Sequence, residues 1–395
     1  MKTAPTLKPS TWMLALLLAA VPLAQLAEAA PVDRYGYTLP PSMQKKAKKK
    51  PARKKPAPGV DYVGEYVNFG QWLEVRAYLD AIAARDGFDR ADLDLLVGKL
   101  RYVDAAVQLI KPAPPGKPKN WQAYSGLFIE PVRIGAGVKF WNDNQEALAR
   151  AESQYGVPAD VIVGILGVET VYGANTGRFR VLDALMTLAF SYPDTPTREA
   201  RMAFFRDELE AALVYARQNN LDPLTLRGSY AGAVGLPQFM PSNIVKYAVD
   251  FDGDGRVDLL NEPGDAIGSV AAFLVAHGWQ RGDAGPPAYP ASVSPNRAWE
   301  AYLGRGLAAT LAPGELAAAG VSTTAPLPDG ELFGLVDLQN GAEATEYWVA
   351  TPNFFAITQY NRSYFYAMSV VELGRAVRLA RTAATTAAAA PEAGQ

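Results

Sequence analysis

The segment PADVIVGILGVETVYG, residues 158–173, is the most informative stretch of this chain. Its apolar residues recur at helical spacing, so we expect a helix that begins at Ala159 and carries Ile165 and Leu166 on one face. Glu169 falls on the same face and ends the apolar stripe with a carboxylate. Burial raises the pKa of a carboxyl group, so this Glu can stay protonated near neutral pH and donate a proton. A Glu that satisfies a core hydrogen bond, or that lies at an exposed helix end, fits the same pattern.

A second segment, GSYAGAVGLPQFMPS at residues 228–242, is rich in glycine and has no charged residue. Backbone amides and neutral polar side chains beside apolar faces suit a sugar that carries N-acetyl groups. A phosphate-binding loop is not indicated, because the Lys that follows Gly in such loops is missing. The segment therefore favours a glycan site over a nucleotide site.

An acidic segment, DFDGDGRVD at residues 250–258, matches the calcium-loop pattern, with Gly255 at the sixth position. The twelfth position, where a bidentate Glu is expected, is Asn261, and Glu262 follows it. An acidic surface turn and a weaker, sodium-like site are the alternatives. We expect a structural Ca²⁺ clamp rather than a sensor, since the chain has one such loop. The predicted ligands are Asp250, Asp252, Asp254, the backbone carbonyl of Arg256, Asp258 and Glu262.

Five blocks of the sequence occur in the same order as in the lytic murein transglycosylases of the MltB type, which this chain resembles from about residue 62 to 381. The blocks are ETVYG (169–173), AGAVGLPQFMPS (231–242), the acidic loop (250–262), DAIGSVAAFLVAHGW (265–279) and TPNFFAITQYNRSYFYAM (351–368). The resemblance implies a mainly α (α+β) fold, with a lysozyme-like core, a flanking helical subdomain and a small β element. It also implies non-hydrolytic cleavage of MurNAc-β-1,4-GlcNAc bonds that leaves 1,6-anhydro-MurNAc ends.

The same resemblance implies that Glu169 is the sole catalytic acid and base. The resemblance places Ser229 and Gln238 beside Glu169, and Tyr124, Tyr360 and Asn361 along the groove. It adds Arg201, or Arg198 within the loop 194–200, and Phe204 after that loop as further substrate contacts. Phe204 stands where the family often has Tyr, so the ring is kept and a hydroxyl is lost. No cofactor is needed for the chemistry that the family performs.

Two other functions fit parts of the pattern. A hydrolytic muramidase would add a second carboxylate and leave reducing ends, and a non-catalytic glycan-binding wall protein would bind strands without turnover. Thiol nucleophiles, disulfides and Cys/His zinc sites are excluded, because the chain has no cysteine and one histidine. Hydrolytic chemistry would therefore depend on carboxylates or on a metal held by oxygen ligands.

The chain ends predict export to the periplasm. Two lysines precede the apolar run 12–26, and Ala27-Glu28-Ala29 is a cleavage motif, so residues 1–29 are expected to be a signal peptide without a lipoprotein cysteine. Residues 30–60 are a predicted basic linker, either a solvated spacer or a weak attraction to membrane or wall polymers. We expect the catalytic region at 61–381 and a frayed low-complexity tail at 382–395.

Charge argues against a nucleic-acid partner. Residues 1–60 hold 11 of the 38 basic residues and two of the 40 acidic ones, so the rest has 27 basic and 38 acidic residues. A net charge near −11 for the remainder leaves no overall basic footprint for DNA or RNA. The remaining predicted partner is the peptidoglycan glycan strand itself.

The remaining pattern is mostly helical. Helices are expected at residues 71–84, after Asp89, and at 140–155, 201–218, 265–277 and 364–381. A short hairpin is expected from segments 332–338 and 346–349, which flank the turn dipeptide Asn340-Gly341. The stretch 282–328 is rich in Gly, Pro and Ala, and no element is predicted there.

Overall fold

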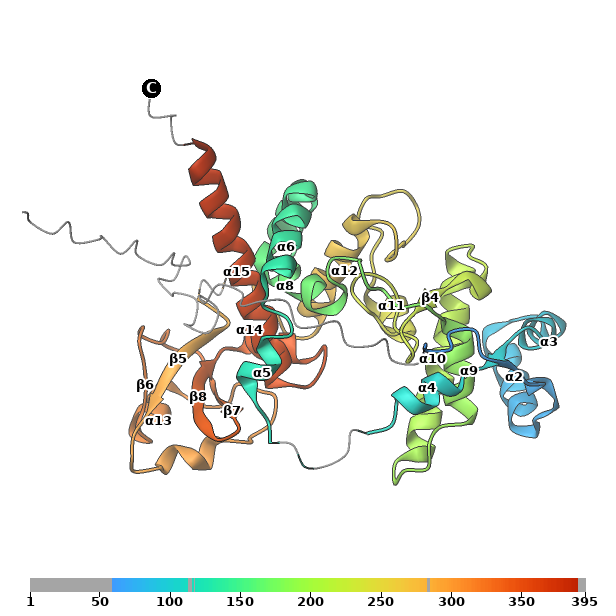
Figure 1. Ribbon diagram of the computed structural model, residues 1–395, viewed down its shortest axis with the longest axis horizontal. Helices are drawn as coiled ribbons and strands as arrows, with labels where there is room; N and C mark the ends of the chain where they lie inside the picture. The colour runs from blue at the N-terminus through green and yellow to red at the C-terminus, as the bar shows by residue number, and fades with distance from the viewer. Residues whose placement is uncertain (1–58, 113–115, 117, 283–284, 390–395) are drawn as a thin grey trace, which may run out of the picture. The chain divides into compact units, whose positions relative to one another are not determined.

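The computed structural model describes residues 59–112, 116, 118–282 and 285–389 (Figure 1). The predicted signal peptide, nearly all of the basic linker and the last six residues of the tail lie outside these ranges. Within them, no helix combines the length and the apolar character needed to cross a bilayer.

The first described part is helical, as predicted. The Asp89 side chain accepts hydrogen bonds from the backbone of Ala91 and Asp92, which caps the helix that follows it. A two-stranded antiparallel pair, β1 (Glu65–Tyr66) with β2 (Arg101–Tyr102), joins the segments on either side of the first two α-helices. Its elements are β1 (Glu65–Tyr66), α2 (Leu73–Asp86), α3 (Arg90–Val97), β2 (Arg101–Tyr102) and α4 (Asp104–Leu109).

The helix predicted at residues 140–155 is two helices, so that prediction was wrong. α6 (Pro131–Asp143) ends before Asn144, and α7 (Gln145–Tyr155) begins after it. Asn144 has φ −119° and ψ 27°, outside the helical range, and both its backbone amide and its side chain donate to the carbonyl of Phe140 at the end of α6. Both helices pack against the helix that follows them, α8 (Ala159–Thr170).

The predicted central helix is confirmed as α8 (Ala159–Thr170). It packs most extensively against α15 (Tyr364–Ala389), which lies beside it in Figure 1. The two backbones are in direct contact, because a Cβ added at Gly164 would lie 2.3 Å from the carbonyl oxygen of Val370. α15 continues past Arg381 to Ala389, into the predicted low-complexity tail, where alanine favours helix, and the rest of that tail lies outside the described residues.

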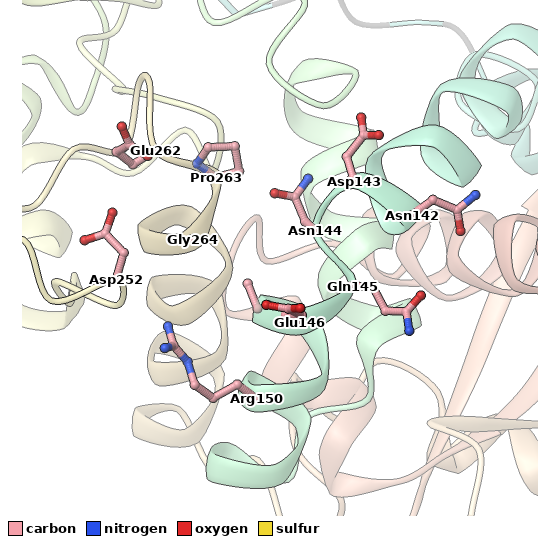
Figure 2. Close-up of a pocket in the computed structure, with 11 residues that line it drawn as sticks. Asn142, Asp143, Asn144, Gln145, Glu146, Arg150, Asp252, Glu262, Pro263 and Gly264 are labelled. Carbon is pink, nitrogen blue, oxygen red and sulfur yellow. The ribbon is translucent and has the colours of Figure 1, made fainter.

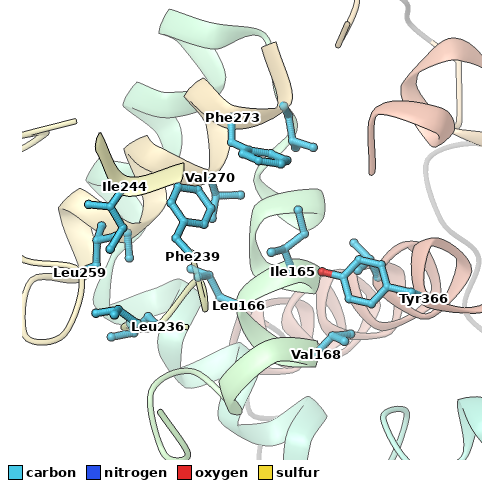
Figure 3. Close-up of a cluster of buried hydrophobic side chains, with 14 of the residues drawn as sticks. Ile165, Leu166, Val168, Leu236, Phe239, Ile244, Leu259, Val270, Phe273 and Tyr366 are labelled. Atoms are coloured by element: carbon cyan, nitrogen blue, oxygen red, sulfur yellow. The ribbon is translucent and has the colours of Figure 1, made fainter. Parts of the chain in front are cut away.

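A further group of elements surrounds the glycine-rich segment. The predicted helices 201–218 and 265–277 are confirmed with slightly earlier starts. A further helix, α9 (Val181–Phe190), is buried along its whole length. Figure 3 shows the apolar cluster in which Ile165 and Leu166 meet Phe239 and Phe273. The elements are β3 (Phe179–Arg180), α9 (Val181–Phe190), α10 (Arg198–Gln218), β4 (Arg227–Gly228), α11 (Pro241–Tyr247) and α12 (Pro263–Ala276).

The β element is larger than predicted. The hairpin is confirmed as β7 (Gly334–Asn340) and β8 (Glu343–Ala350), but two more strands extend it into a four-stranded antiparallel sheet of order β6-β5-β8-β7. β5 (Ala288–Val293) and β6 (Val321–Thr323) come from the stretch in which no element was expected. The sheet has a hydrophobic cluster of its own with α13 (Pro313–Ala318).

Two short helices connect this sheet to the helical core. α14 (Pro352–Thr358) follows β8 and leads into α15. α5 (Trp121–Ser125) is attached to the hairpin, because the Asn340 side chain accepts a hydrogen bond from the Gln122 backbone at 2.9 Å. The sheet therefore fixes the position of α5, which carries Tyr124.

Candidate active site

Glu169 lies in the last turn of α8 and is the one residue of that helix that is not fully buried. The Tyr366 hydroxyl, from α15, donates a hydrogen bond to Glu169 Oε1 at 2.6 Å. Figure 3 shows the Tyr366 ring with its hydroxyl turned toward α8. Burial raises the pKa of Glu169 from 4.5 to about 7, although the Tyr366 hydrogen bond opposes this by favouring the ionised form. Glu169 can therefore exchange a proton near neutral pH.

No second carboxylate influences this group among the residues that the structure describes. Burial and the Tyr366 hydrogen bond are the causes of the shifted pKa of Glu169, and no charged side chain adds to them. Two carboxyl groups within the short separation that retaining glycosidases use would raise each other's pKa by repulsion. The site thus has one titrating carboxyl group.

Three tyrosines surround Glu169. Burial raises the pKa values of Tyr124, Tyr360 and Tyr366, and the negative charge of Glu169 raises each of them further. The rings of Tyr360 and Tyr366 stack with centroids 6.1 Å apart. The Tyr360 hydroxyl is buried and has no hydrogen-bond partner in the described part of the chain, so it can serve a ligand.

Tyr366 was not predicted as a site residue. Its place in an apolar helix, beside Ala367 and Met368, is typical of a core aromatic residue. Two signals were available: it falls within the block 351–368, and a buried Tyr hydroxyl needs a polar partner. Tyr124 and Tyr360, which the sequence did predict, lie close enough to Glu169 for its charge to affect them.

The chain leaves α8 through a tight turn directly after Glu169. Val171 and Tyr172 both have positive φ values, 53° and 57°, which non-glycine residues seldom adopt. The Tyr172 ring stacks on Phe140, and its hydroxyl occupies the space where side chains at Gly137 and Gly167 would lie. Glycine at these two positions therefore makes room for the turn that places Glu169.

The glycine-rich segment is attached to α8 beside Glu169. The Thr170 hydroxyl donates to the carbonyl of Leu236 at 2.9 Å. Ser229 Oγ accepts hydrogen bonds from the backbone of its own turn, and Gln238 Nε2 donates to the carbonyl of Thr176 at 3.0 Å. Neither side chain hydrogen-bonds to Glu169 within the described residues, so their predicted contact with the substrate stays a prediction.

Three other predicted residues are not joined to Glu169 by any contact in the described residues. The Arg201 guanidinium lies 4.9 Å above the ring of Phe204, and it also faces the rings of Tyr192 and Phe205. Asn361 is exposed in the turn between α14 and α15. Arg201 and Phe204 form one cluster on α10, and their roles stay predictions.

The acidic loop brings three carboxylates together. Oxygen atoms of Asp250, Asp252 and Asp254 all lie within 4.8 Å of one another, and all three side chains are exposed. Backbone amides of the loop point at the Asp250 carboxylate, among them that of Gly255 at 2.8 Å. Oxygen donors in this arrangement match the preference of Ca²⁺.

The remaining predicted ligands are not in this cluster. The Asp258 carboxylate accepts hydrogen bonds from the backbone of Leu260 and Asn261, and the Arg256 side chain, whose carbonyl is the predicted ligand, forms an ion pair with Asp254 at 3.0 Å. Glu262 lies with Asp252 on one side of a cavity of about 780 Å³, opposite residues of α6 and α7 (Figure 2).

A residue that the sequence reasoning missed holds the loop in shape. Asp265, buried at the start of α12, accepts backbone hydrogen bonds from Phe251 at 2.7 Å and from Asp258 at 2.8 Å. Burial raises the pKa of Asp265, and these hydrogen bonds oppose the rise. The loop therefore has an internal anchor besides any bound ion.

Comparisons with known proteins agree on one family. Residues 69–375 match the family described as the transglycosylase SLT domain. The membrane-bound lytic murein transglycosylase B of Escherichia coli is 42% identical over 323 residues, which cover 80% of this chain and 85% of that protein. The soluble lytic transglycosylase SltB1 of Pseudomonas aeruginosa is 44% identical, with a TM-score of 0.71, over 78% of this chain and 99% of that one. The Escherichia coli lytic transglycosylase Slt35 in complex with calcium is 40% identical, with a TM-score of 0.71, over 82% and 98% of the two chains.

Proposed function

Because the chain belongs to the transglycosylase SLT domain family and is a peptidoglycan lytic transglycosylase, we propose that Glu169 is its sole acid and base. The proposal rests on one observation: the carboxyl group of Glu169 has a pKa of about 7 and accepts a hydrogen bond from the Tyr366 hydroxyl. A carboxyl group in this state can give a proton and later take one back at the same pH.

The proposed reaction begins with proton transfer from Glu169 to the oxygen of the MurNAc-β-1,4-GlcNAc bond. The bond between that oxygen and C1 of MurNAc then breaks, and the N-acetyl group of MurNAc stabilises the oxocarbenium-like centre. Glu169, now a carboxylate, accepts the proton of the C6 hydroxyl while that oxygen bonds to C1. The proton balance closes without water, and the product carries a 1,6-anhydro end.

Tyr366 is proposed to position the acid. Its hydroxyl engages Oε1 of Glu169 and thereby leaves Oε2 to face the glycosidic oxygen. Tyr360 and Tyr124 supply rings beside the carboxyl group, and their burial limits the water that could compete with the C6 hydroxyl. Ser229 and Gln238 are proposed to bind the sugar at the glycine-rich segment.

The reaction is tested by whether oxygen from water enters the product. Purified protein is incubated with sacculi in H₂¹⁸O, and the released muropeptides are analysed by mass spectrometry. Anhydro ends without ¹⁸O are expected, each lighter by one water than a hydrolysis product. Reducing ends that carry ¹⁸O would identify a hydrolytic muramidase and overturn the proposed mechanism.

A structural Ca²⁺ is proposed in the acidic loop. Three clustered carboxylates supply oxygen ligands, and the similar Slt35 was solved in complex with calcium. The proposed ligands are Asp250, Asp252, Asp254, the carbonyl of Arg256, Asp258 and Glu262. The ion would neutralise the mutual repulsion of the carboxylates and takes no part in proton transfer.

The place of action is proposed to be the periplasm, after cleavage of a signal peptide near Ala29. The murein substrate lies outside the cytoplasm, and the chain begins with a basic and then an apolar run that is typical of export signals. The basic linker is proposed to add a weak attraction to acidic wall polymers or lipid headgroups.

A further inference from the structure

Four arginines gather around a cavity of about 370 Å³ where β3 pairs with β4. Arg180 and Arg227 face each other in the register of this pair, and Arg101 and Arg178 complete the set. The concentration of positive charge is unusual here, because residues 61–395 hold 27 basic and 38 acidic residues. A local cationic cavity in an acidic body suggests an anionic ligand.

One of the four arginines has a structural role. Arg180 forms two hydrogen bonds of 2.7 Å with the buried carboxylate of Asp183, and it also donates to the carbonyl of Lys99. Asp183 further accepts the backbone amide of Arg101 at 2.9 Å. The acid in this cavity is therefore already neutralised by Arg180 and by a backbone donor.

The other three guanidinium groups can bind a ligand. Within the described residues, the side chains of Arg101, Arg178 and Arg227 form no hydrogen bond and no ion pair, and Arg178 lies 5.1 Å above the ring of Tyr62. Arg178 and Arg227 are exposed. A planar guanidinium group pairs with a carboxylate through two parallel hydrogen bonds, so these groups suit a ligand with several carboxylates.

The cavity adjoins the glycine-rich segment. Arg227 is separated from Ser229 by Gly228 alone, so their Cα atoms lie at most about 7 Å apart. Gly177, next to Arg178, touches the backbone of Gly228 so closely that a Cβ there would lie 2.1 Å from its carbonyl oxygen. Both exposed arginines are thus fixed to the backbone of the proposed sugar-binding wall.

We propose that this arginine cavity binds carboxylates of the stem peptide that a murein strand carries on MurNAc. The inference rests on the proposed function, since it needs a strand in the groove beside Ser229. The glycan backbone is poor in charge, whereas the stem peptide bears several carboxylates, which makes the peptide the part that three free guanidinium groups recognise. The cavity then distinguishes strands with peptides from strands without them.

The test compares two substrates for each variant. Arg178→Gln, Arg227→Gln and the double variant are assayed on soluble glycan strands with intact stem peptides and on the same strands stripped by an amidase. We expect KM for peptide-bearing strands to rise about threefold to fivefold for each arginine, the effect of one partly exposed ion pair, and KM for stripped strands to stay unchanged. Arg76→Gln, which removes an exposed arginine on α2, is the matched control.

Two further measurements test whether the arginines bind the peptide carboxylates. Arg227→Lys keeps the charge but loses the planar pair of donors, so it should retain only part of the preference for peptide-bearing strands. Isothermal titration with the free stem peptide should show binding to the wild type that the double variant loses. Equal changes on both substrates, or an equal change in Arg76→Gln, would overturn the proposal. Failure of the proposed function is a different result, because the wild type would then form no anhydro ends on either substrate.

Discussion

The carboxyl group of Glu169 is under two opposing influences. Burial in the last turn of α8 favours its neutral form, and the hydrogen bond from Tyr366 favours its ionised form. Burial has the larger effect, and the pKa of about 7 leaves both forms populated at neutral pH. One residue can then act as acid in the first half of the reaction and as base in the second.

Replacing Tyr366 by Phe should raise the pKa of Glu169, because the variant removes the hydrogen bond that lowers it. The alkaline limb of the profile of kcat/KM against pH should move to higher pH. The maximal rate should fall, because the acid loses the hydroxyl that positions it. Tyr364→Phe is the matched control, since that hydroxyl in the same helix donates to the carbonyl of Gly306. An unchanged alkaline limb in Tyr366→Phe would show that the hydrogen bond does not tune the acid.

The sequence could predict Glu169 but not its partner. A carboxylate at the end of an apolar helical stripe is visible in residues 158–173, because helical periodicity is a local property. The contact with Tyr366 joins residues 197 positions apart, and only the packing of α8 on α15 produces it. Local patterns carry no information about such a pairing.

The packing of α8 on α15 determines where Glu169 and Tyr366 meet. The two backbones touch at Gly164, and a second close approach occurs where Gly374 meets the carbonyl of Asp160. Close contact between glycine-bearing helices leaves little freedom for one helix to slide against the other. The 2.6 Å hydrogen bond at the active site depends on this rigid pair.

Gly164→Ala should destabilise the protein and also reduce activity, because the new methyl group would lie 2.3 Å from the carbonyl oxygen of Val370. We expect a loss of about 1–3 kcal/mol in the free energy of unfolding, typical of overpacking in a core. Gly135→Ala in α6 is the control, since nothing lies within 4 Å of its added Cβ, and alanine there should be neutral or stabilising. Equal stability of the two variants would contradict direct backbone contact between α8 and α15.

Calcium should raise the melting temperature, because the loop places three carboxylates within 4.8 Å and a bound cation removes their repulsion. At ~100-fold excess over Kd, binding to the folded state alone stabilises by about 2.7 kcal/mol. Asp250→Ala and Asp254→Ala should lose the response, and Glu262→Gln tests whether this residue is a ligand. Identical melting curves in calcium and in chelator would show that the loop holds no ion.

Helices and strands were predicted well where the apolar residues recur regularly. They were predicted poorly where a single residue or a partner strand determines the structure. The break between α6 and α7 falls at Asn144, whose backbone leaves the helical range, and the apolar periodicity continues across it. β5 and β6 lie in a stretch rich in Gly, Pro and Ala that shows no alternation. Their partners β8 and β5 create these strands, so they could not be predicted locally.

For the whole molecule, keeping Glu169 buried carries a cost in stability that depends on pH. The folded-state pKa of about 7 lies above the ordinary value of 4.5, so the stability that the neutral form provides is present below about pH 4.5 and is lost as pH rises through 7. Glu169→Gln, neutral at every pH, should therefore be more stable than the wild type at pH 8, by up to about 3 kcal/mol, and nearly equal at pH 4. Chemical denaturation at the two pH values measures the difference, and no gain at pH 8 would show that the carboxylate is not penalised by burial.

Whether one carboxyl group performs both proton transfers is measured by the activity of Glu169→Gln on purified sacculi. The variant keeps the shape of the side chain and can still accept the Tyr366 hydrogen bond, but it has no proton to exchange near neutral pH. Release of anhydro-muropeptides, followed by mass spectrometry, should fall at least about 100-fold at unchanged thermal stability or better. Release at a rate near that of the wild type would contradict the claim and place the acid and base on other residues.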